Sequence, residues 1–361
     1  MYKFVTVMLA MFLVVTAVAW GNKSGEAEES VQAELPALSP VGDLVQRIAV
    51  EAKRKDYRIE DVGVVYKILP DQRLLVSPTS QHKRLAVYDP ETHENDWVIE
   101  QVKGKKRIGS ADANADHVAW VELTPQKDQV DWEIRYEERK TGIERVVSSG
   151  RSRLEPRMLA VFDDVLAWNE VVDHDNTYEE QIVMYDLNTR ERNVLAVSED
   201  ATAMHFEGPR MYGSRILWGE VRHEDRGLAQ STLFVYDRKT ERTAPVVTGG
   251  FNQSPALFGS YVVYIREDQV LLHDLATGKT FRVSEEQDKA RKMVPSVSNL
   301  GVGWISEDLH GRFFRFDTGE VEDIGEVANR GTTMGPNAVL WAVKQPLGKQ
   351  MNQVFHLRLW Q

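Results

Sequence analysis

The chain has 361 residues, 42% of them hydrophobic and 27% charged, a globular composition that argues against disorder along its whole length. Its formal net charge of −11 argues against a nucleic-acid-binding surface, which needs clustered lysine and arginine to neutralise phosphates. The sequence contains no cysteine, which excludes disulfides, thiol catalysis, thiolate metal ligands and a lipid-modified cysteine.

Residues 1–20 have the pattern of an export signal. Lys3 supplies a positive start, the following residues up to Ala19 are apolar apart from two threonines, and Ala17-Val18-Ala19 resembles a cleavage site. The run is shorter than the roughly 20 apolar residues of a membrane-spanning helix. A cleaved signal peptide is therefore favoured, with an uncleaved N-terminal membrane anchor as the alternative. Either reading predicts an exported protein, secreted, periplasmic or held in the cell envelope.

Residues 21–56 are expected to form a tether and a short helix. Residues 21–40 are rich in acidic and small residues and show no periodicity, which predicts a solvated tether. Across residues 41–55, apolar side chains recur at three- and four-residue spacing, which predicts an amphipathic helix. Its apolar stripe is expected to rest on the following domain. A membrane-surface role for its basic end, Lys53-Arg54-Lys55, is the alternative.

One pattern recurs through residues 57–361, most clearly at residues 164–195. A short apolar run ends in an aromatic residue, a polar loop follows, and a second run closes with an acidic turn. Seven copies at a spacing of roughly 40 to 50 residues predict an all-β fold, a β-propeller with one four-stranded blade per copy. The aromatic residues that mark the copies are Trp120, Trp168, Trp218, Tyr264, Trp304 and Trp341. Six blades is the alternative, if the degenerate first copy (residues 73–92) and the incomplete last copy form one blade.

The ends of this region complement each other. Residues 57–72 contain the apolar strand VGVVYKIL without a closing turn, and the sequence stops at Gln361 where another run of the last copy is due. We therefore expect an N-terminal strand to complete the last blade and close the ring, which removes free sheet edges.

Acidic residues that end a strand are interpreted as turn residues. An aspartate at the first position of a tight turn accepts backbone N–H groups, and a following glycine supplies a positive φ. The residues concerned are Asp89, Asp186, Asp237, Asp274 and Asp317, with Glu137 or Glu138 in the second full copy.

These runs resemble a known family. IVMYDLNT (residues 182–189) and LFVYDRKT (residues 233–240), each after a strand ending in tryptophan, are similar to the TolB-like propellers, WD40-like repeat proteins exported by bacteria. The resemblance covers about residues 73–361, but the family's usual SPDG turn is replaced, for example by residues 114–117. It implies a periplasmic or extracellular protein-binding scaffold. Some members carry a fused peptidase domain, which this sequence does not show.

Catalytic motifs are absent from the sequence, which has no HExxH, no GxSxG and no Walker-type loop. Asp112-x-Asn114-x-Asp116 comes nearest to a calcium loop, but the glycine and the acidic twelfth residue are missing, which favours a turn. We therefore predict no catalytic residue, no metal site and no cofactor.

The alternative is a propeller-type carbohydrate-active enzyme, a glycoside hydrolase or lyase that uses carboxylates near the central channel. Such chemistry needs two facing carboxylates about 5 to 9.5 Å apart. Glu122, Glu170 and Glu220 each stand two residues after a tryptophan and are the candidates. The competing interpretation is that they are solvated charges at strand ends.

The connections between the second and third strands of a blade share one face with the connections into the next blade. These loops are long and polar at residues 123–131, 171–180 and 221–231, and shrink to almost nothing at Asp268. Carboxylates, imidazoles and guanidiniums on one face suit a polar ligand or peptide, although exposed loops are commonly polar. The candidate binding residues are Asp173, His174, Asp175, His205, Arg210, His223, Glu224 and Asp225. We predict a monomeric, non-enzymatic scaffold that binds a protein or a cell-envelope polymer.

Overall fold

The protein is described by a computed structural model. It covers residues 38–43, 54–60, 62–78, 81–174, 178–198, 206–223, 229–285, 290–328, 332–347 and 350–360. These residues belong to one compact unit, residues 34–361.

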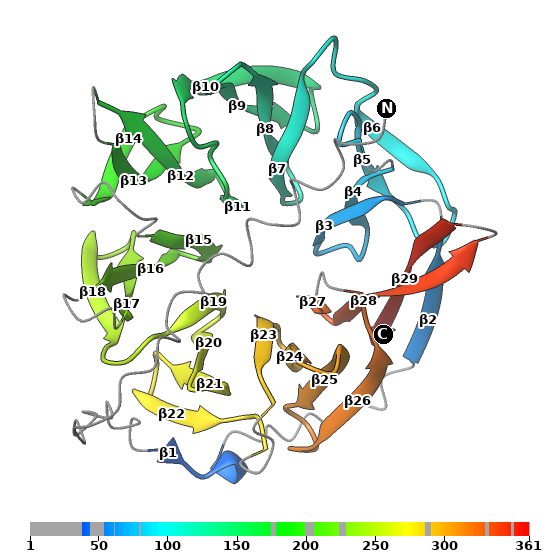
Figure 1. Ribbon diagram of the computed structural model, residues 1–361, viewed down its shortest axis with the longest axis vertical. Helices are drawn as coiled ribbons and strands as arrows, with labels where there is room; N and C mark the ends of the chain where they lie inside the picture. Colours follow the sequence, from blue (N-terminus) through cyan, green and yellow to red (C-terminus); the bar gives the residue numbers. More distant parts are fainter. Residues whose placement is uncertain are drawn as a thin grey trace, which may run out of the picture. The chain divides into compact units, whose positions relative to one another are not determined.

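Seven antiparallel sheets stand around a common axis and form a seven-bladed β-propeller (Figure 1). In the first six blades the four main strands run in chain order from the axis outward, and blade 5 carries one further strand outside its fourth. The predicted fold and the count of seven blades are thus confirmed, and the alternative of six is wrong.

The first four blades use residues 64–247. Blade 1 consists of β3 (Val64–Ile68), β4 (Leu74–Ser77), β5 (Leu85–Tyr88) and β6 (Asn95–Ile99). Blade 2 consists of β7 (Arg107–Ala113), β8 (His117–Pro125), β9 (Val130–Glu138) and β10 (Ile143–Ser152). Blade 3 consists of β11 (Leu159–Phe162), β12 (Val165–Asp173), β13 (Tyr178–Asp186) and β14 (Arg192–Ser198). Blade 4 consists of β15 (Phe206–Tyr212), β16 (Arg215–His223), β17 (Ala229–Asp237) and β18 (Arg242–Val247).

The last three blades combine the C-terminal part of the chain with two N-terminal strands. Blade 5 consists of β19 (Gln253–Phe258), β20 (Tyr261–Arg266), β21 (Gln269–Asp274) and β22 (Lys279–Arg282), with β1 (Leu38–Ser39) as a fifth strand. Blade 6 consists of β23 (Lys292–Val297), β24 (Gly301–Ser306), β25 (His310–Arg315) and β26 (Val321–Glu326). Blade 7 consists of β27 (Thr332–Gly335), β28 (Ala338–Leu347), β29 (Gln350–Trp360) and β2 (Arg54–Ile59).

The repeated aromatic residues form the hydrophobic core. Trp120, Trp168, Trp218, Tyr264 and Trp304 each lie on the second strand of a blade and are at most 1% exposed. They pack with aliphatic residues of the same and the neighbouring blade; Trp168, for example, shares a cluster with Ile134 of blade 2. Because each face of a blade is covered by the next blade, the ring buries its apolar surface without a separate central core.

The N-terminal strand that closes the ring is not the one that the sequence suggested. VGVVYKIL contains β3, which is the innermost strand of blade 1. The closing strand is β2, which precedes it and pairs antiparallel with β29 from Arg54↔Trp360 to Ile59↔Phe355. Ile59 is fully buried in a cluster that joins blade 7 to blade 1. The expected closure is therefore present, but through the six residues just before the predicted strand.

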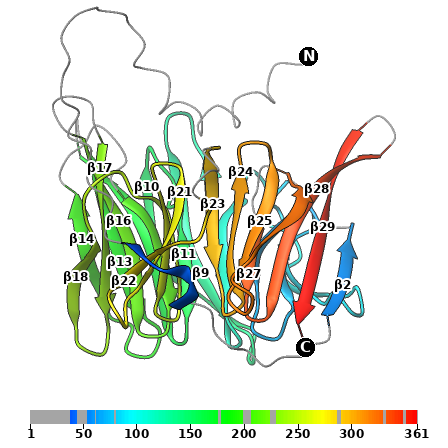
Figure 2. The same cartoon turned by 90° about the horizontal axis from the view of Figure 1, so that it is seen from below.

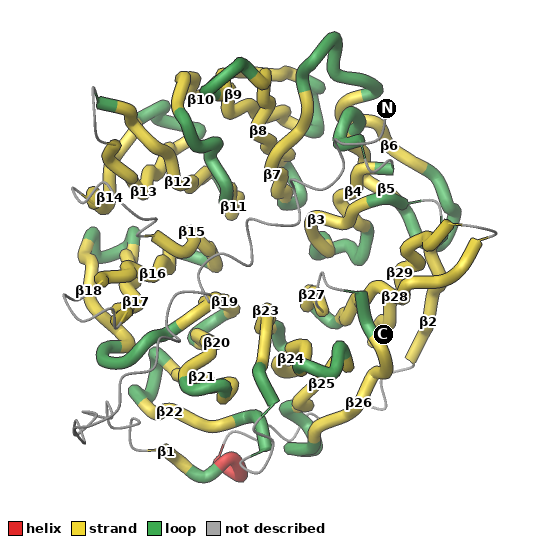
Figure 3. Tube along the Cα trace, in the orientation of Figure 1, coloured by secondary structure: helices red, strands yellow, loops and turns green. Residues whose placement is uncertain are grey.

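The segment before β2 differs from the expected tether and helix. Leu38 and Ser39, placed in the tether, pair parallel with Thr280 and Phe281 at the outer edge of blade 5. A short 3-10 helix, η2 (Val41–Asp43), follows and is the one helix among the described residues (Figure 3). Most of the predicted helix falls on residues 44–53, outside the described residues. Arg54 and Lys55, at its expected end, belong to β2.

Four of the predicted acidic turn residues accept backbone N–H groups of their turns. Asp186 accepts the backbone N–H groups of Asn188 and Thr189, both at 2.9 Å. Asp89, Asp237 and Asp274 cap their turns in the same way. Gly278 closes the Asp274 turn with a φ of 70°, a conformation that glycine adopts without strain.

Candidate functional site

The face that carries the second-to-third-strand connections is raised over some blades and low over others. The second and third strands have nine residues in blades 2, 3 and 4, but six in blades 5 and 6. In blade 5 the connection is the two-residue turn Glu267-Asp268, both with positive φ, which confirms the short loop. The longest hairpin, β28–β29 of blade 7, is drawn in red in Figure 2 and was not singled out from the sequence.

A pocket of about 510 Å³ lies on this face at blade 2. Its lining comes from the β8–β9 loop and from the end of β10: Gln126, Lys127, Asp128, Gln129, Arg151 and Arg153. All six residues are exposed. The lining carries three cations and one carboxylate, and two further carboxylates, Asp131 and Asp173, contact its residues. We refer to these six residues as the rim pocket.

Asp173 joins the rim pocket to blade 3. It ends β12, and its Oδ2 accepts the backbone N–H of Arg153 at 3.0 Å and the side-chain amide of Gln129 at 3.4 Å. Its Oδ1 is buried and has no partner within the described part of the chain. Asp173 therefore fixes the β10–β11 connection beside the blade 2 loop, and it is a predicted site residue that contacts the rim pocket.

The other predicted site residues are only partly described. The Nε2 atom of His174 lies 4.0 Å from the carboxylate of Glu179, and the backbone of His223 ends β16. Asp175, His205, Glu224 and Asp225 lie outside the described residues. Lys127 and Arg153 escaped the sequence analysis; the available signal was Arg151-x-Arg153 at the end of a strand, which puts both guanidiniums on one side.

Arg210 is placed away from this face. It lies within β15 opposite Leu217, near the end of the blade where β16 begins, and its Nη1 is 3.1 Å from Sδ of Met158 in the connection before β11. Burial lowers the pKa of Arg210, and nearby Glu207 and Asp112 partly compensate. Burial likewise raises the pKa of Glu207, although the backbone N–H of Ser254 opposes the effect. Arg210 thus belongs to a set of charges along the inner strands.

These inner-strand charges connect neighbouring blades. Lys67 of β3 forms a 2.7 Å ion pair with Asp112 of β7, and the other oxygen of Asp112 accepts the backbone N–H of Val161 in β11 at 2.7 Å. Glu207 of β15 accepts the backbone N–H of Ser254 in β19 at 2.5 Å. Asp112, considered above for a calcium loop, is therefore a structural link, and Asn114 caps a turn. Among the described residues no group of three His, Asp or Glu could hold a metal ion.

The three carboxylates considered for sugar cleavage are held by cations of their own blades. Glu122 pairs with Lys106 at 2.5 Å, and Glu220 pairs with Arg222 at 2.9 Å. Glu170 is buried and receives hydrogen bonds from Trp168 Nε1 at 2.7 Å and Arg192 Nη2 at 2.5 Å.

Glu170 thus departs from the expectation of a solvated strand-end charge. In all three blades the carboxylate is neutralised within its blade, an arrangement that favours a structural role over a catalytic pair.

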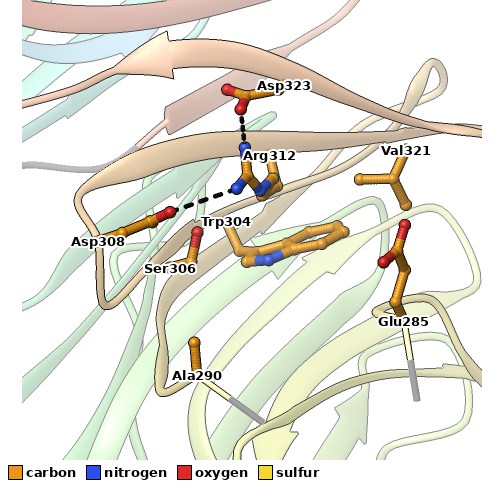
Figure 4. A pocket seen from close by; sticks show the side chains of 8 residues that line it. All are labelled: Glu285, Ala290, Trp304, Ser306, Asp308, Arg312, Val321 and Asp323. Atoms are coloured by element: carbon orange, nitrogen blue, oxygen red, sulfur yellow. Dashed lines mark hydrogen bonds and ion pairs between the residues drawn. The ribbon is translucent and has the colours of Figure 1, made fainter. Parts of the chain in front are cut away.

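A second pocket, of about 310 Å³, lies at blade 6, where the face is low. We call it the blade 6 pocket; it is lined by Glu285, Ala290, Trp304, Ser306, Asp308, Arg312, Val321 and Asp323 (Figure 4). Arg312 is held between Asp308, at 3.4 Å, and Asp323. Burial alone raises the pKa of Asp308, but the backbone N–H of His310 and the charge of Arg312 bring it below the ordinary value. Asp308 therefore stays ionised at neutral pH.

Together, the fold and the two polar pockets define a seven-bladed β-propeller with a polar, uneven face. Among solved structures, the β-propeller domain of the Trilobed protease from Pyrococcus furiosus is 9% identical, with a TM-score of 0.55 over 85% of this chain and 92% of that one. A prolyl endopeptidase is 12% identical, with a TM-score of 0.54 over 88% of this chain and 49% of its own. TolB from Acinetobacter baumannii is 14% identical, with a TM-score of 0.39 over 85% of this chain and 63% of that one.

At these identities the likeness shows the fold alone. The solved neighbours include TolB and other propeller proteins, and the chain spans about half the length of the prolyl endopeptidase. No protein-family model matches the sequence, and no curated protein matches it. No helix within the described residues has the length and apolar character needed to cross a membrane.

Proposed function

We propose that the protein is a non-enzymatic, exported binding module, and that its raised face holds an acidic segment of a protein or cell-envelope polymer. One observation carries this proposal: the rim pocket gathers Lys127, Arg151 and Arg153 on a chain whose net charge is −11. Guanidinium and ammonium groups bind carboxylates and phosphates through charge-assisted hydrogen bonds. Export follows from the predicted signal at residues 1–20.

The geometry supports binding to an extended partner. The rim pocket continues through Asp173 to the end of blade 3, so a partner could contact two adjacent blades. Arg151 is partly engaged by Asp131, whereas Lys127 and Arg153 form no ion pair with any residue in the described part of the chain. An acidic partner therefore finds two available cations beside a fixed third one.

The test is affinity capture from an envelope extract. The variant K127E/R151E/R153E should lose the captured partner, because three attractive charges become repulsive. The matched control is K140E/R190E/K239E, which changes three exposed cations in the third-to-fourth-strand turns at the opposite end of the blades. It should capture as wild type does.

A second variant tests the residues predicted from the sequence. Replacing Asp173, His174, His223 and Asp225 together with alanine should also abolish capture, because Asp173 positions the rim pocket. Capture unchanged in both variants would reject this face and, with it, the proposed function.

A further inference from the structure

Blade 6 lacks a carboxylate that blades 2, 3 and 4 share. In those blades a glutamate follows the core tryptophan by two residues and, by strand alternation, lies on the same side of the sheet. In blade 6 the corresponding residue after Trp304 is Ser306. Its hydroxyl donates to the backbone carbonyl of His310 at 3.1 Å. The blade 6 pocket therefore lies where a longer, acidic side chain is missing.

A buried indole donor of blade 6 has no acceptor among the described residues. In blade 3 Glu170 accepts the indole N–H of Trp168. Trp304 is 1% exposed, and its Nε1 has no partner within the described residues. The indoles of Trp120 and Trp218 also lack a partner, so an orphan donor alone does not mark a site. In blade 6 it coincides with a pocket, and Figure 4 shows the indole among the residues that line it.

The charge of the pocket lining limits which kind of ligand could accept the indole N–H of Trp304. Among the described lining residues, Glu285, Asp308 and Asp323 face a single guanidinium, that of Arg312, which gives a formal charge of −2. The buried Lys292 lies opposite Ser306 on β23, donates to the backbone carbonyl of Ala290 and reduces this negative charge. Arg312 lies directly opposite Trp304 on β25, as Arg135 lies opposite Trp120 in blade 2. Because two aspartates already hold Arg312, a free anion would meet net repulsion. A ligand that brings a positive charge and an uncharged oxygen would meet attraction.

We propose that the blade 6 pocket binds a small ligand that carries a primary ammonium group next to a carbonyl or hydroxyl oxygen. The ammonium lies among the carboxylates of Glu285, Asp308 and Asp323, and the oxygen accepts the indole N–H of Trp304. This chemistry occurs at the free amino terminus of a short peptide and in an amino sugar. The site is separate from the rim pocket and does not depend on the proposed function.

Isothermal titration of the full-length protein tests the proposal with two pairs of probes. Triglycine and glucosamine are each compared with the N-acetyl form, which keeps the oxygens but removes the ammonium charge. At least one free amine should bind saturably and about tenfold more tightly than its acetylated form, the effect of one charge-assisted contact. The free amine that binds identifies the source of the ligand.

Two variants place the binding in this pocket. S306E restores the carboxylate of blades 2–4, fills the space over Trp304 and should abolish binding. E285Q changes an exposed residue, so it should keep the fold and weaken binding about five- to tenfold. If circular dichroism shows that S306E is misfolded, the binding affinity of E285Q tests the location of the site instead.

The rim variant K127E/R151E/R153E should bind the probes as wild type does, which separates this site from the proposed function. Equal binding of free and acetylated probes, no saturable binding of either amine, or wild-type binding by a folded S306E and by E285Q would overturn the proposal.

Discussion

A glutamate two residues after a core tryptophan has different surroundings in different blades. Glu170 is 5% exposed and bridges Trp168 to Arg192, whereas Glu220 pairs with Arg222, whose side chain is 77% exposed. Loss of the first contact is costly, because the buried indole N–H of Trp168 cannot bind water in place of Glu170.

We predict that E170A lowers the free energy of unfolding by about 1–3 kcal/mol, because the buried indole N–H of Trp168 loses its acceptor. The equivalent change E220A, at a solvent-screened pair, should cost less than about 1 kcal/mol. Urea unfolding followed by tryptophan fluorescence measures both. Equal losses in the two variants would contradict the assigned role of Glu170.

Because of Tyr264, the free energy of unfolding is expected to change with pH in the alkaline range. Burial raises its pKa to about 12, against the ordinary 10.0. Between these values the unfolded chain has released the phenolic proton and the folded protein retains it, so stability falls as pH rises. Below pH 10 both states are protonated and the contribution is fully present.

We predict that wild type loses up to about 2.5 kcal/mol relative to Y264F between pH 10 and 12. Phenylalanine keeps the buried ring and removes the titrating group. Urea midpoints of the two proteins, measured at several pH values from 8 to 12, check this. A constant difference across the range would show that Tyr264 does not titrate with a raised pKa.

Residue patterns on a single strand or turn could be predicted from the sequence, and contacts across blades could not. The core tryptophans and the aspartate turns follow from local spacing, because neighbouring residues determine both. The Arg153–Asp173 contact depends on how two loops of different blades meet. Lys127 is one of many exposed lysines until the β8–β9 loop places it beside Arg151.

At the scale of elements, the packing of the raised blade 2 hairpin requires a glycine in β10. A Cβ on Gly150 of β10 would lie 2.4 Å from Cζ2 of Trp132 on the paired strand β9. The indole cannot easily move, because its Nε1 donates to Ser152 at 3.1 Å and its ring is 5% exposed. Gly150 therefore permits the packing of Trp132 next to the arginines of the rim pocket.

We predict that G150A destabilises the protein by about 1–3 kcal/mol through overpacking and weakens partner capture by the rim. The control is G42A, because an added Cβ at Gly42 has no atom within 4 Å. Thermal unfolding and near-ultraviolet circular dichroism measure stability and the environment of Trp132. A G150A protein with wild-type values in both would show that the ring tolerates the methyl group.

The mistaken identity of the closing strand has a physical cause. In β2, RKDYRI, Ile59 is the one buried residue and the rest are polar or partly exposed. A strand at the outer edge needs little apolar surface, so its sequence carries a weak signal. The strongly apolar VGVVYKIL is easier to recognise, but its buried character fits an inner position.

At the scale of the whole molecule, blade 7 holds the ring closed by pairing β2 with β29. Ile59 of β2 packs with Leu357 of blade 7 and Tyr88 of blade 1. Closure of this kind satisfies the edge of β29 and covers the seam between the first and last blades. The spacing of the sequence repeats was enough to predict seven blades, including the blade that both ends of the propeller sequence share.

We predict that deleting residues 1–53 leaves a folded propeller, since it removes only the two-residue β1 among the blade strands. Deleting residues 1–60 also removes the buried side chain of Ile59. This should lower the free energy of unfolding by at least about 2–4 kcal/mol. It should also cause self-association through the bare edge of β29. Thermal unfolding and size-exclusion chromatography compare the two proteins; equal stability and size would contradict closure by β2.

The shared blade also determines when the ring can close during synthesis of the chain. β2 is made before any blade, yet its partner β29 is made after the six complete ones, so β2 must stay unpaired until nearly the whole chain has been translated. Contacts of such long sequence separation form late and slowly. The ring therefore cannot close until the last hairpin of the chain has been made.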